Sequence, residues 1–167
     1  MKQHLLPPEL VDKARAVVEA NRRVGRKVAV AESCTGGLVC AALTEIPGSS
    51  EVLDAGYVTY SNEAKMAALN VSAEVVETFG AVSIATAWAM AQGALASSDA
   101  DVAVAITGIA GPDGGTPSKP VGTVVFARAE RQPGPDDVTA DQKLFENENR
   151  AGVRLQAALC ALDLLMP

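Results

Sequence analysis

The feature that most constrains the fold of this chain is a pair of short, nearly uninterrupted apolar runs, Lys27–Ala31 and Asp101–Ile106. A strand with one solvated face alternates apolar and polar residues, whereas a strand inside a parallel sheet is buried on both faces and is apolar almost throughout. A sheet of that kind needs a helical layer on each face. The two runs therefore predict an α/β protein with a buried, largely parallel sheet.

Further strands and several helices alternate with these runs. Strands are predicted at Ala55–Tyr60 and Gly122–Ala129, with a weaker one at Val138–Phe145. Apolar residues at helical spacing, with glycine or proline stops and Ser61 as an N-cap, predict helices at residues 9–23, 38–45, 62–69, 72–79, 83–97 and 149–165. The last two strands follow each other directly, so we expect them to pair antiparallel.

The length and composition fit one globular domain. The chain has 167 residues, of which 49% are hydrophobic and 20% charged, so a disordered chain is a poor interpretation. The sequence contains no internal repeat and no second domain. The expected fold is a three-layer α/β/α single domain over residues 1–167, with a mixed, mostly parallel sheet of about five strands.

Charge and the rarer residue types exclude several classes of function. The formal net charge is -6, whereas a general nucleic-acid binder needs a basic face. Three cysteines lack metal-ligand spacing, and His4 is the single histidine, which leaves no base for a histidine triad. We therefore expect no nucleic acid, no metal and no cofactor. Neither a membrane span nor a signal peptide is recognisable, so we expect no membrane partner and a cytoplasmic protein.

Three strand ends carry residues suited to chemistry. Sites in open α/β sheets lie beyond the carboxyl ends of the strands. The segments at those ends are Glu32–Gly37, Tyr60–Lys65 and Thr107–Gly115. If their strands pair side by side, all three segments converge on one edge of the sheet.

The first segment offers a serine at the start of a helix. Ser33 follows a strand directly, and Gly36 and Gly37 follow it, so backbone N–H groups there could hold a phosphate or an oxyanion. An alternative is that Ser33 or Thr35 only caps the helix. Cys34 is a rival nucleophile, because a helix start lowers the pKa of a thiol.

The other two segments offer a base and a flexible loop. A desolvated Lys65 could take the proton of a serine hydroxyl, and Tyr60 could relay it. The alternative is an ordinary exposed lysine and a packed tyrosine. The glycine-dense stretch Thr107–Gly115 lacks the Gly-Lys-Ser/Thr ending of a P-loop, so a ribose or phosphate cradle and a structural loop both remain open.

Five blocks occur together in a specific order: Ala31–Gly37, Val58–Lys65, Gly80–Ser83, Thr107–Gly115 and Lys119–Thr123. In this the chain strongly resembles the CinA C-terminal domain family, the nicotinamide-nucleotide amidases. The resemblance covers about residues 8 to 165. It implies a three-layer α/β/α domain that hydrolyses nicotinamide mononucleotide to nicotinate mononucleotide and ammonia, without a metal, in pyridine-nucleotide salvage.

The resemblance also implies roles for single residues. Ser33 matches the nucleophile, and Tyr60 and Lys65 match its activating partners. Oxyanion or substrate contacts are implied for Cys34, Thr35, Gly36, Gly37, Thr107, Gly108 and Arg150. Arg150 and Arg154 match basic positions of the last helix, although Glu146–Asn149 stands where relatives usually have Gly-Asp. The chain is expected to be the stand-alone form of the domain, with a small nucleotide as substrate, and to form a homo-oligomer.

Two alternatives to this activity remain open. One is a non-catalytic nucleotide-binding module with a regulatory or competence-related role, which would have no need of Ser33 together with Lys65. The other is deamidation of a related pyridine or pterin compound. Because Ser33, Tyr60 and Lys65 are all present, the sequence favours an enzyme.

Overall fold

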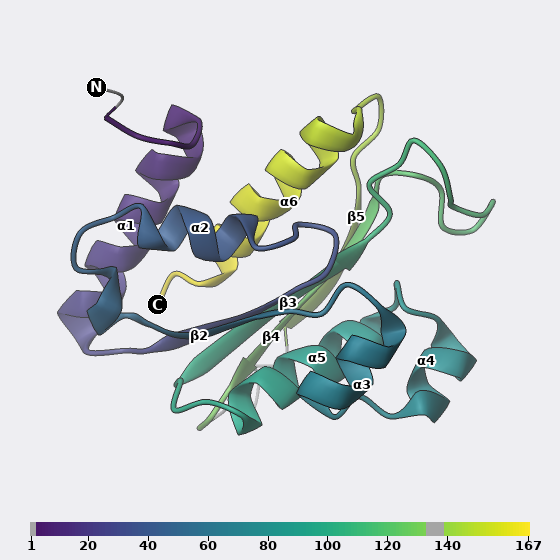
Figure 1. The fold of residues 1–167 in the computed structure, drawn as a ribbon, viewed down its shortest axis with the longest axis horizontal. Helices are drawn as coiled ribbons and strands as arrows, with labels where there is room; N and C mark the ends of the chain where they lie inside the picture. Colours follow the sequence, from purple (N-terminus) through teal and green to yellow (C-terminus); the bar gives the residue numbers. More distant parts are fainter. Residues whose placement is uncertain (1–2, 133–138) are drawn as a thin grey trace.

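The computed structural model describes residues 3–132 and 139–167 (Figure 1). Along the chain it contains α1 (Pro8–Val24), β1 (Val28–Glu32), α2 (Leu38–Thr44), a 3-10 turn η1 (Ser49–Glu51), β2 (Leu53–Val58), α3 (Asn62–Leu69), α4 (Ala73–Phe79), α5 (Ile84–Ala96), β3 (Val102–Gly108), β4 (Thr123–Glu130), β5 (Thr139–Leu144) and α6 (Arg150–Leu164). The predicted alternation of strands and helices is confirmed. The first residue of the predicted strand Val138–Phe145 lies outside the described residues.

One five-stranded sheet, in the order β2-β1-β3-β4-β5, forms the centre of the domain. β1 pairs in parallel with both β2 and β3, whereas β4 pairs antiparallel with β3 and with β5. As predicted, the antiparallel pairs are at the end of the chain, where no helix separates the strands. The α/β fold with a mixed sheet is confirmed.

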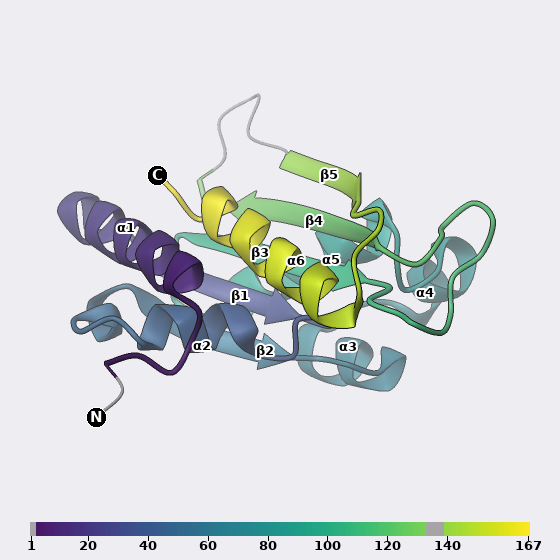
Figure 2. The same cartoon turned by 90° about the horizontal axis from the view of Figure 1, so that it is seen from above.

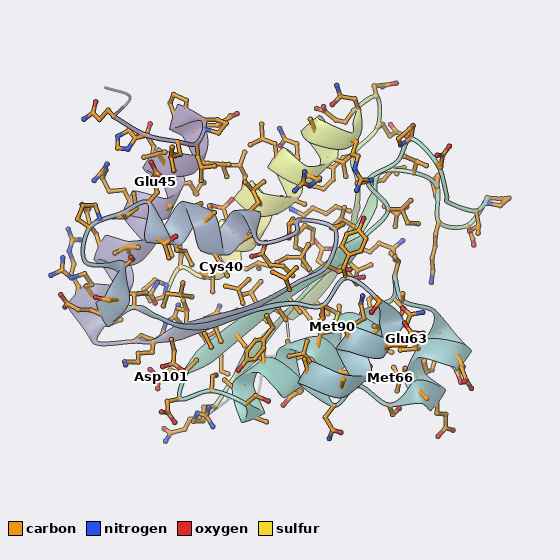
Figure 3. The ribbon with its side chains drawn as sticks, in the orientation of Figure 1. Cys40, Glu45, Glu63, Met66, Met90 and Asp101 are labelled. Atoms are coloured by element: carbon orange, nitrogen blue, oxygen red, sulfur yellow. The ribbon has the colours of Figure 1, made fainter. Side chains whose placement is uncertain are left out.

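Helices cover both faces of the sheet (Figures 1 and 2). α1, α2 and α6 lie on one face, and α3, α4 and α5 lie on the other. Figure 3 shows Cys40 of α2 and Met90 of α5 on opposite sides of the strands. The central strands alternate accordingly: valines such as Val30 and Val104 pack under α1, α2 and α6, and alanines such as Ala31 face α5. The small alanine side chains let α5 lie close to the sheet.

Two strand boundaries differ from the prediction and move residues of the candidate site. β2 runs from Leu53 to Val58, so Tyr60 lies two residues beyond its end instead of in the strand. β2 is an edge strand in which exposed and half-buried residues alternate. Because the charged Asp54 lies on the exposed side, the apolar pattern used for the prediction began only at Ala55. β3 continues to Gly108, so Thr107 belongs to the sheet and not to the loop after it.

The parallel strands β1, β2 and β3 all end at one edge of the sheet. The β1 and β2 arrows in Figure 2 point toward the same side, where α6 also begins. This edge therefore receives the Ser33 turn, the segment before α3, the end of β3 and the first turn of α6. The predicted convergence of the three segments is confirmed.

The helix that carries Lys65 is fixed by a close contact with α5. A Cβ atom added at Gly93 of α5 would lie 2.0 Å from the Leu69 carbonyl oxygen at the end of α3. Alanine normally stabilises an exposed helix relative to glycine, but overpacking against a backbone costs about 1–3 kcal/mol. We expect Gly93→Ala to lower the free energy of unfolding by an amount in that range, measured by urea denaturation.

Gly152→Ala in α6 is the matched control for this exchange. Its added Cβ would meet the end of the Glu148 side chain, which is exposed and can rotate away. We therefore expect Gly152→Ala to leave the stability equal to the wild type or higher. Equal stability of both variants would contradict the close contact between α3 and α5.

Candidate active site

The central contact of the site joins a serine and a lysine. Lys65 Nζ lies 3.0 Å from Ser33 Oγ. The turn after β1 supplies Ser33, and α3 supplies Lys65, with Ser61 capping that helix as predicted: its side chain accepts a hydrogen bond from the Ala64 N–H. A hydroxyl and an amine at this distance form a nucleophile and its base if the amine is neutral.

Lys65 is not the exposed helix lysine of the alternative interpretation. Its side chain is only 1% exposed and is among the largest of those fully buried. Burial disfavours the charged ammonium, so the pKa of Lys65 is lowered from its ordinary value by desolvation. The amine is therefore more readily neutral than a surface lysine.

Two backbone carbonyls orient this amine. Lys65 Nζ donates to the carbonyl oxygen of Thr59 at 2.9 Å and to that of Tyr60 at 3.3 Å. An ammonium has three hydrogens, which match these two carbonyls and Ser33 Oγ. A neutral amine has two hydrogens and a lone pair, so the carbonyls take both hydrogens and the lone pair faces Ser33. The geometry suits a lysine that accepts a proton from Ser33 and returns it.

A pocket of about 190 Å³ opens onto this pair. Of the sequence-predicted residues it brings together Ser33, Cys34, Tyr60, Lys65, Thr107, Gly108 and Arg150. Thr35, Gly36 and Gly37 do not line it. Asn62, Ala81, Val82 and Ala110 complete the wall; they lie within the blocks that carry the family resemblance, but they were not predicted from the sequence as site residues.

Tyr60 and Arg150 lie together at the mouth of the pocket. The Tyr60 side chain is 61% exposed, and its hydroxyl accepts a hydrogen bond of 3.0 Å from Arg150 Nη2. Arg150 Nη1 also donates to the Gly111 carbonyl oxygen at 2.8 Å. Tyr60 thus contacts Lys65 through its backbone oxygen and directs its hydroxyl toward Arg150. The Lys65 amine therefore contacts Ser33 Oγ directly, and the Tyr60 hydroxyl does not lie between them.

Cys34 is poorly suited to be the nucleophile. Its side chain is 5% exposed, and burial raises the pKa of its thiol to about 11. A thiol with such a pKa carries little thiolate at neutral pH. The helix start does not lower the pKa here because desolvation has the larger effect.

Thr107 and Gly108 form the floor of the pocket. Thr107 is buried, and its hydroxyl donates to the Ala81 carbonyl oxygen at 2.9 Å, which holds the 80–83 segment against β3. A Cβ at Gly108 would lie 2.8 Å from a Val124 methyl carbon and 3.1 Å from Cys34 Sγ. Glycine is needed at this position because β4, with Val124 and the Thr123 carbonyl oxygen at 2.9 Å, and the Cys34 side chain both pack closely on it.

Sequence reasoning also missed the role of Glu32. This residue is fully buried, and its carboxylate accepts hydrogen bonds from the N–H groups of Val39 at 3.0 Å and Cys40 at 3.1 Å. A buried carboxylate at a helix start is stabilised by these N–H groups and by the helix dipole. The start of α2, which the sequence suggested as an anion cradle, is thus occupied by the protein's own carboxylate.

Glu32→Gln should destabilise the domain. A glutamine can offer its single oxygen to one of the two N–H groups, and its NH2 group faces the other, so a buried donor loses its acceptor. Such a loss costs about 1–3 kcal/mol. We expect the free energy of unfolding of Glu32→Gln, measured by urea denaturation, to decrease by that amount. Glu77→Gln, at an exposed position of α4, is the control and should be as stable as the wild type. A Glu32→Gln variant as stable as the control would contradict this role.

The Ser33 turn is also anchored from α6. Arg154 Nε and Nη2 donate to the carbonyl oxygens of Cys34 and Thr35, both at 3.1 Å. Arg154 does not line the pocket, whereas Arg150 does. Of the two arginines that the sequence left open as a substrate contact, Arg150 is the one placed to meet a ligand.

The part of the chain that the structure describes contains neither a candidate metal-binding cluster nor a helix that could span a membrane. Among residues 3–132 and 139–167, no three or more His, Cys, Asp and Glu side chains gather so as to hold a metal ion. In the same part of the chain, no helix combines the length and apolar character needed to cross a bilayer.

Comparison with known proteins places this arrangement in a family. A sequence model described as the CinA C-terminal domain matches residues 11–167. A relative from Symbiobacterium thermophilum is 52% identical over 146 residues, which are 84% of this chain and 34% of that protein. A CinA-like protein from Mycobacterium avium is 50% identical over 141 residues, 84% of this chain and 32% of that protein. The chain thus spans about a third of the length of these relatives.

Solved structures resemble the whole chain. The competence/damage inducible protein CihA from Agrobacterium tumefaciens is 45% identical, with a TM-score of 0.91 over 99% of this chain and 97% of that one. The competence damage-inducible protein A (ComA) from Klebsiella pneumoniae is 36% identical, with a TM-score of 0.87 over 94% of both chains.

Proposed function

This chain belongs to the CinA C-terminal domain family, and on that premise we propose that it hydrolyses the carboxamide of nicotinamide mononucleotide to nicotinate mononucleotide and ammonia. The observation that carries the proposal is the buried Lys65 amine 3.0 Å from Ser33 Oγ, inside a pocket. A non-catalytic module would have no use for a desolvated lysine held against a serine, because burying an ionisable amine costs free energy.

The first half of the reaction forms an acyl-enzyme. Lys65 takes the Ser33 proton while Ser33 Oγ attacks the carboxamide carbon, which the neighbouring pyridinium charge makes electrophilic. The carbonyl oxygen becomes an oxyanion, for which we assign the N–H group of Cys34, which lines the pocket beside Ser33, as donor. The C–N bond then breaks, Lys65 gives its proton to the leaving nitrogen, and ammonia departs.

The second half restores the enzyme. Lys65 takes a proton from water, the resulting hydroxide attacks the acyl carbon, and the bond to Ser33 Oγ breaks. Lys65 returns the proton to Ser33, and nicotinate mononucleotide leaves. Each proton passes through the one amine that the structure holds against Ser33.

The rest of the nucleotide is assigned to the mouth of the pocket. The pocket of about 190 Å³ is narrow, so the pyridine ring enters and the ribose and phosphate extend outward. Arg150 and Tyr60 lie there, and a guanidinium binds phosphate oxygens through two N–H groups. This arrangement favours a nucleotide over free nicotinamide.

Ammonia release from nicotinamide mononucleotide tests the proposal, with nicotinamide and NAD measured beside it. We expect release from the mononucleotide at a rate well above that from either control compound. Nucleotide binding without ammonia release would overturn the proposal and support the second candidate function, a nucleotide-binding regulatory module. The names of the relatives, which refer to competence and damage induction, favour that second candidate.

A further inference from the structure

Arg154 of α6 holds the turn that contains Ser33 and does not itself line the pocket. Its Nε and Nη2 atoms donate to two successive carbonyl oxygens, those of Cys34 and Thr35. The side chain is half-buried between α6 and the turn, and a Cβ added at Gly36 would lie 3.4 Å from its Nη2 atom. The planar guanidinium therefore fits against the backbone of the turn and bridges two of its peptide units.

These two hydrogen bonds also fix the direction of backbone donors. In a planar trans peptide the N–H points opposite to the C=O of the same unit. Because the Cys34 carbonyl points to Arg154, the Thr35 N–H points away from Arg154. Within the described residues this N–H makes no hydrogen bond, whereas the Gly36 N–H donates to the Ser33 carbonyl oxygen at 3.0 Å. Thr35 is fully buried and does not line the pocket, so Arg154 fixes the orientation of this peptide without presenting its N–H to a ligand.

The turn needs such an anchor because its own sequence allows other conformations. Gly36 and Gly37 have φ angles of 60° and 97°, in the left-handed region that glycine enters readily. A glycine pair of this kind lets the preceding peptide units rotate unless they are held. Ser33 itself is held by its N–H, which donates to the Ile106 carbonyl oxygen at 3.0 Å, and the Thr35–Gly36 peptide is held by the Gly36 N–H on Ser33 and by the Leu38 N–H, which donates to the Thr35 carbonyl oxygen at 3.1 Å. Within the described residues the Cys34–Thr35 peptide has no backbone hydrogen bond of its own, so Arg154 Nε is its anchor.

We propose that Arg154 is a positioning residue: its guanidinium bridges the Cys34 and Thr35 carbonyls and thereby holds the turn so that Ser33 Oγ stays on Lys65. The inference rests on the proposed function, since it takes Ser33 as the nucleophile. It assigns Arg154 no contact with substrate, because the side chain does not line the pocket and two of its donors face the backbone.

The test compares Arg154→Ala and Arg154→Lys with the exposed Arg23→Met of α1. Two substrates are used, nicotinamide mononucleotide and nicotinamide riboside, which lacks the phosphate. We expect both Arg154 variants to lose about 10²-fold in kcat on either substrate, as for a misplaced nucleophile, with KM unchanged. Lysine keeps the positive charge but cannot bridge two carbonyls in the plane of a guanidinium. Methylguanidinium is expected to restore part of the rate of Arg154→Ala and none of the rate of Arg154→Lys.

A fluorophosphonate probe measures the reactivity of Ser33 independently of the substrate. We expect Ser33 of Arg154→Ala to be labelled at least about tenfold more slowly than Ser33 of the wild type. A rate loss of this size is expected when a reacting group is displaced from its productive position. Thermal unfolding, recorded for each variant, identifies any variant that is not folded at the assay temperature. If the wild type labels at Ser33 but releases no ammonia, the proposed substrate fails, and the labelling rates alone decide the role of Arg154.

Three results would overturn the inference. The first is wild-type kcat and wild-type labelling in Arg154→Ala. The second is full activity in Arg154→Lys, which would leave only a charge effect. The third is a higher KM for the mononucleotide alone, which would make Arg154 a phosphate contact. If Arg154→Ala does not fold, the test uses Arg154→Lys instead. A Ser33 labelling rate in Arg154→Lys equal to that of the wild type would then overturn the inference.

Discussion

Ser33→Ala is expected to lower kcat for ammonia release by about 10³-fold or more, as removal of a nucleophile does in serine hydrolases. The methyl group cannot attack the carboxamide, and Lys65 then has no hydroxyl to deprotonate. Nucleotide binding should persist, because Arg150 and Tyr60 at the mouth are untouched. The fold should persist too, since the alanine keeps the N–H that donates to Ile106.

Turnover and binding have to be measured on the same preparation. Steady-state ammonia release gives kcat, and isothermal titration calorimetry gives the affinity for the mononucleotide. Ser50→Ala, an exposed serine of η1, is the matched control and should behave as the wild type. Near-normal turnover in Ser33→Ala would remove Ser33 from the mechanism. A loss of comparable size in Cys34→Ala would instead point to the thiol.

Lys65→Met is expected to abolish turnover to a similar degree, because the pocket then holds no base for Ser33. Lys65→Arg should be equally inactive, since a guanidinium does not lose its proton in proteins. In the wild type kcat/KM should rise with pH until the amine is neutral. Desolvation lowers the pKa of Lys65, so the midpoint of this rise should lie below the ordinary lysine pKa of about 10.4.

The same lowered pKa makes the stability depend on pH in a defined direction. Between the lowered pKa of the folded protein and about 10.4, the unfolded chain holds a proton on Lys65 that the folded protein has released. Stability rises with pH wherever the unfolded state binds more protons. This contribution is therefore fully present above the unfolded pKa and is lost as the pH falls to the folded pKa.

Thermal unfolding checks this sign. The Tm of the wild type minus that of Lys65→Met should increase as the pH is raised through the range below the ordinary lysine pKa of about 10.4. The exposed Lys143→Met of β5 should show no such trend. A difference that stays flat or falls with pH would mean that Lys65 is not a desolvated amine in the folded protein.

Much of the fold was predictable because it follows from local patterns. The buried strands β1 and β3 are apolar runs, and α3 begins where Ser61 offers a cap. Those patterns also predicted that the Ser33, Lys65 and Thr107 segments meet at one edge. β2 was harder to delimit, since an edge strand such as this one tolerates Asp54 on its exposed side.

The burial of individual side chains was not predictable in the same way. Lys65 has the sequence surroundings of a solvated helix residue, and only the tertiary structure buries it, with Ser33 and the Thr59 and Tyr60 carbonyls around its amine. Glu32 gave no sign that it would cap α2, because its partners are backbone N–H groups and have no sequence signature. Arg154 lies some 120 residues from the carbonyls that it contacts, and the sequence alone does not connect them.

The strand order has a consequence for when the candidate site forms during folding. Ser33 and Lys65 are 32 residues apart, and their contact requires β1 and β2 to be paired, because the Thr59 N–H after β2 donates to the Glu32 carbonyl oxygen at the end of β1. The pocket floor further requires β3 beside β1. A partly folded chain that lacks either neighbour of β1 lacks the Ser33–Lys65 contact or the pocket, so the proposed hydrolysis would require the assembled central sheet.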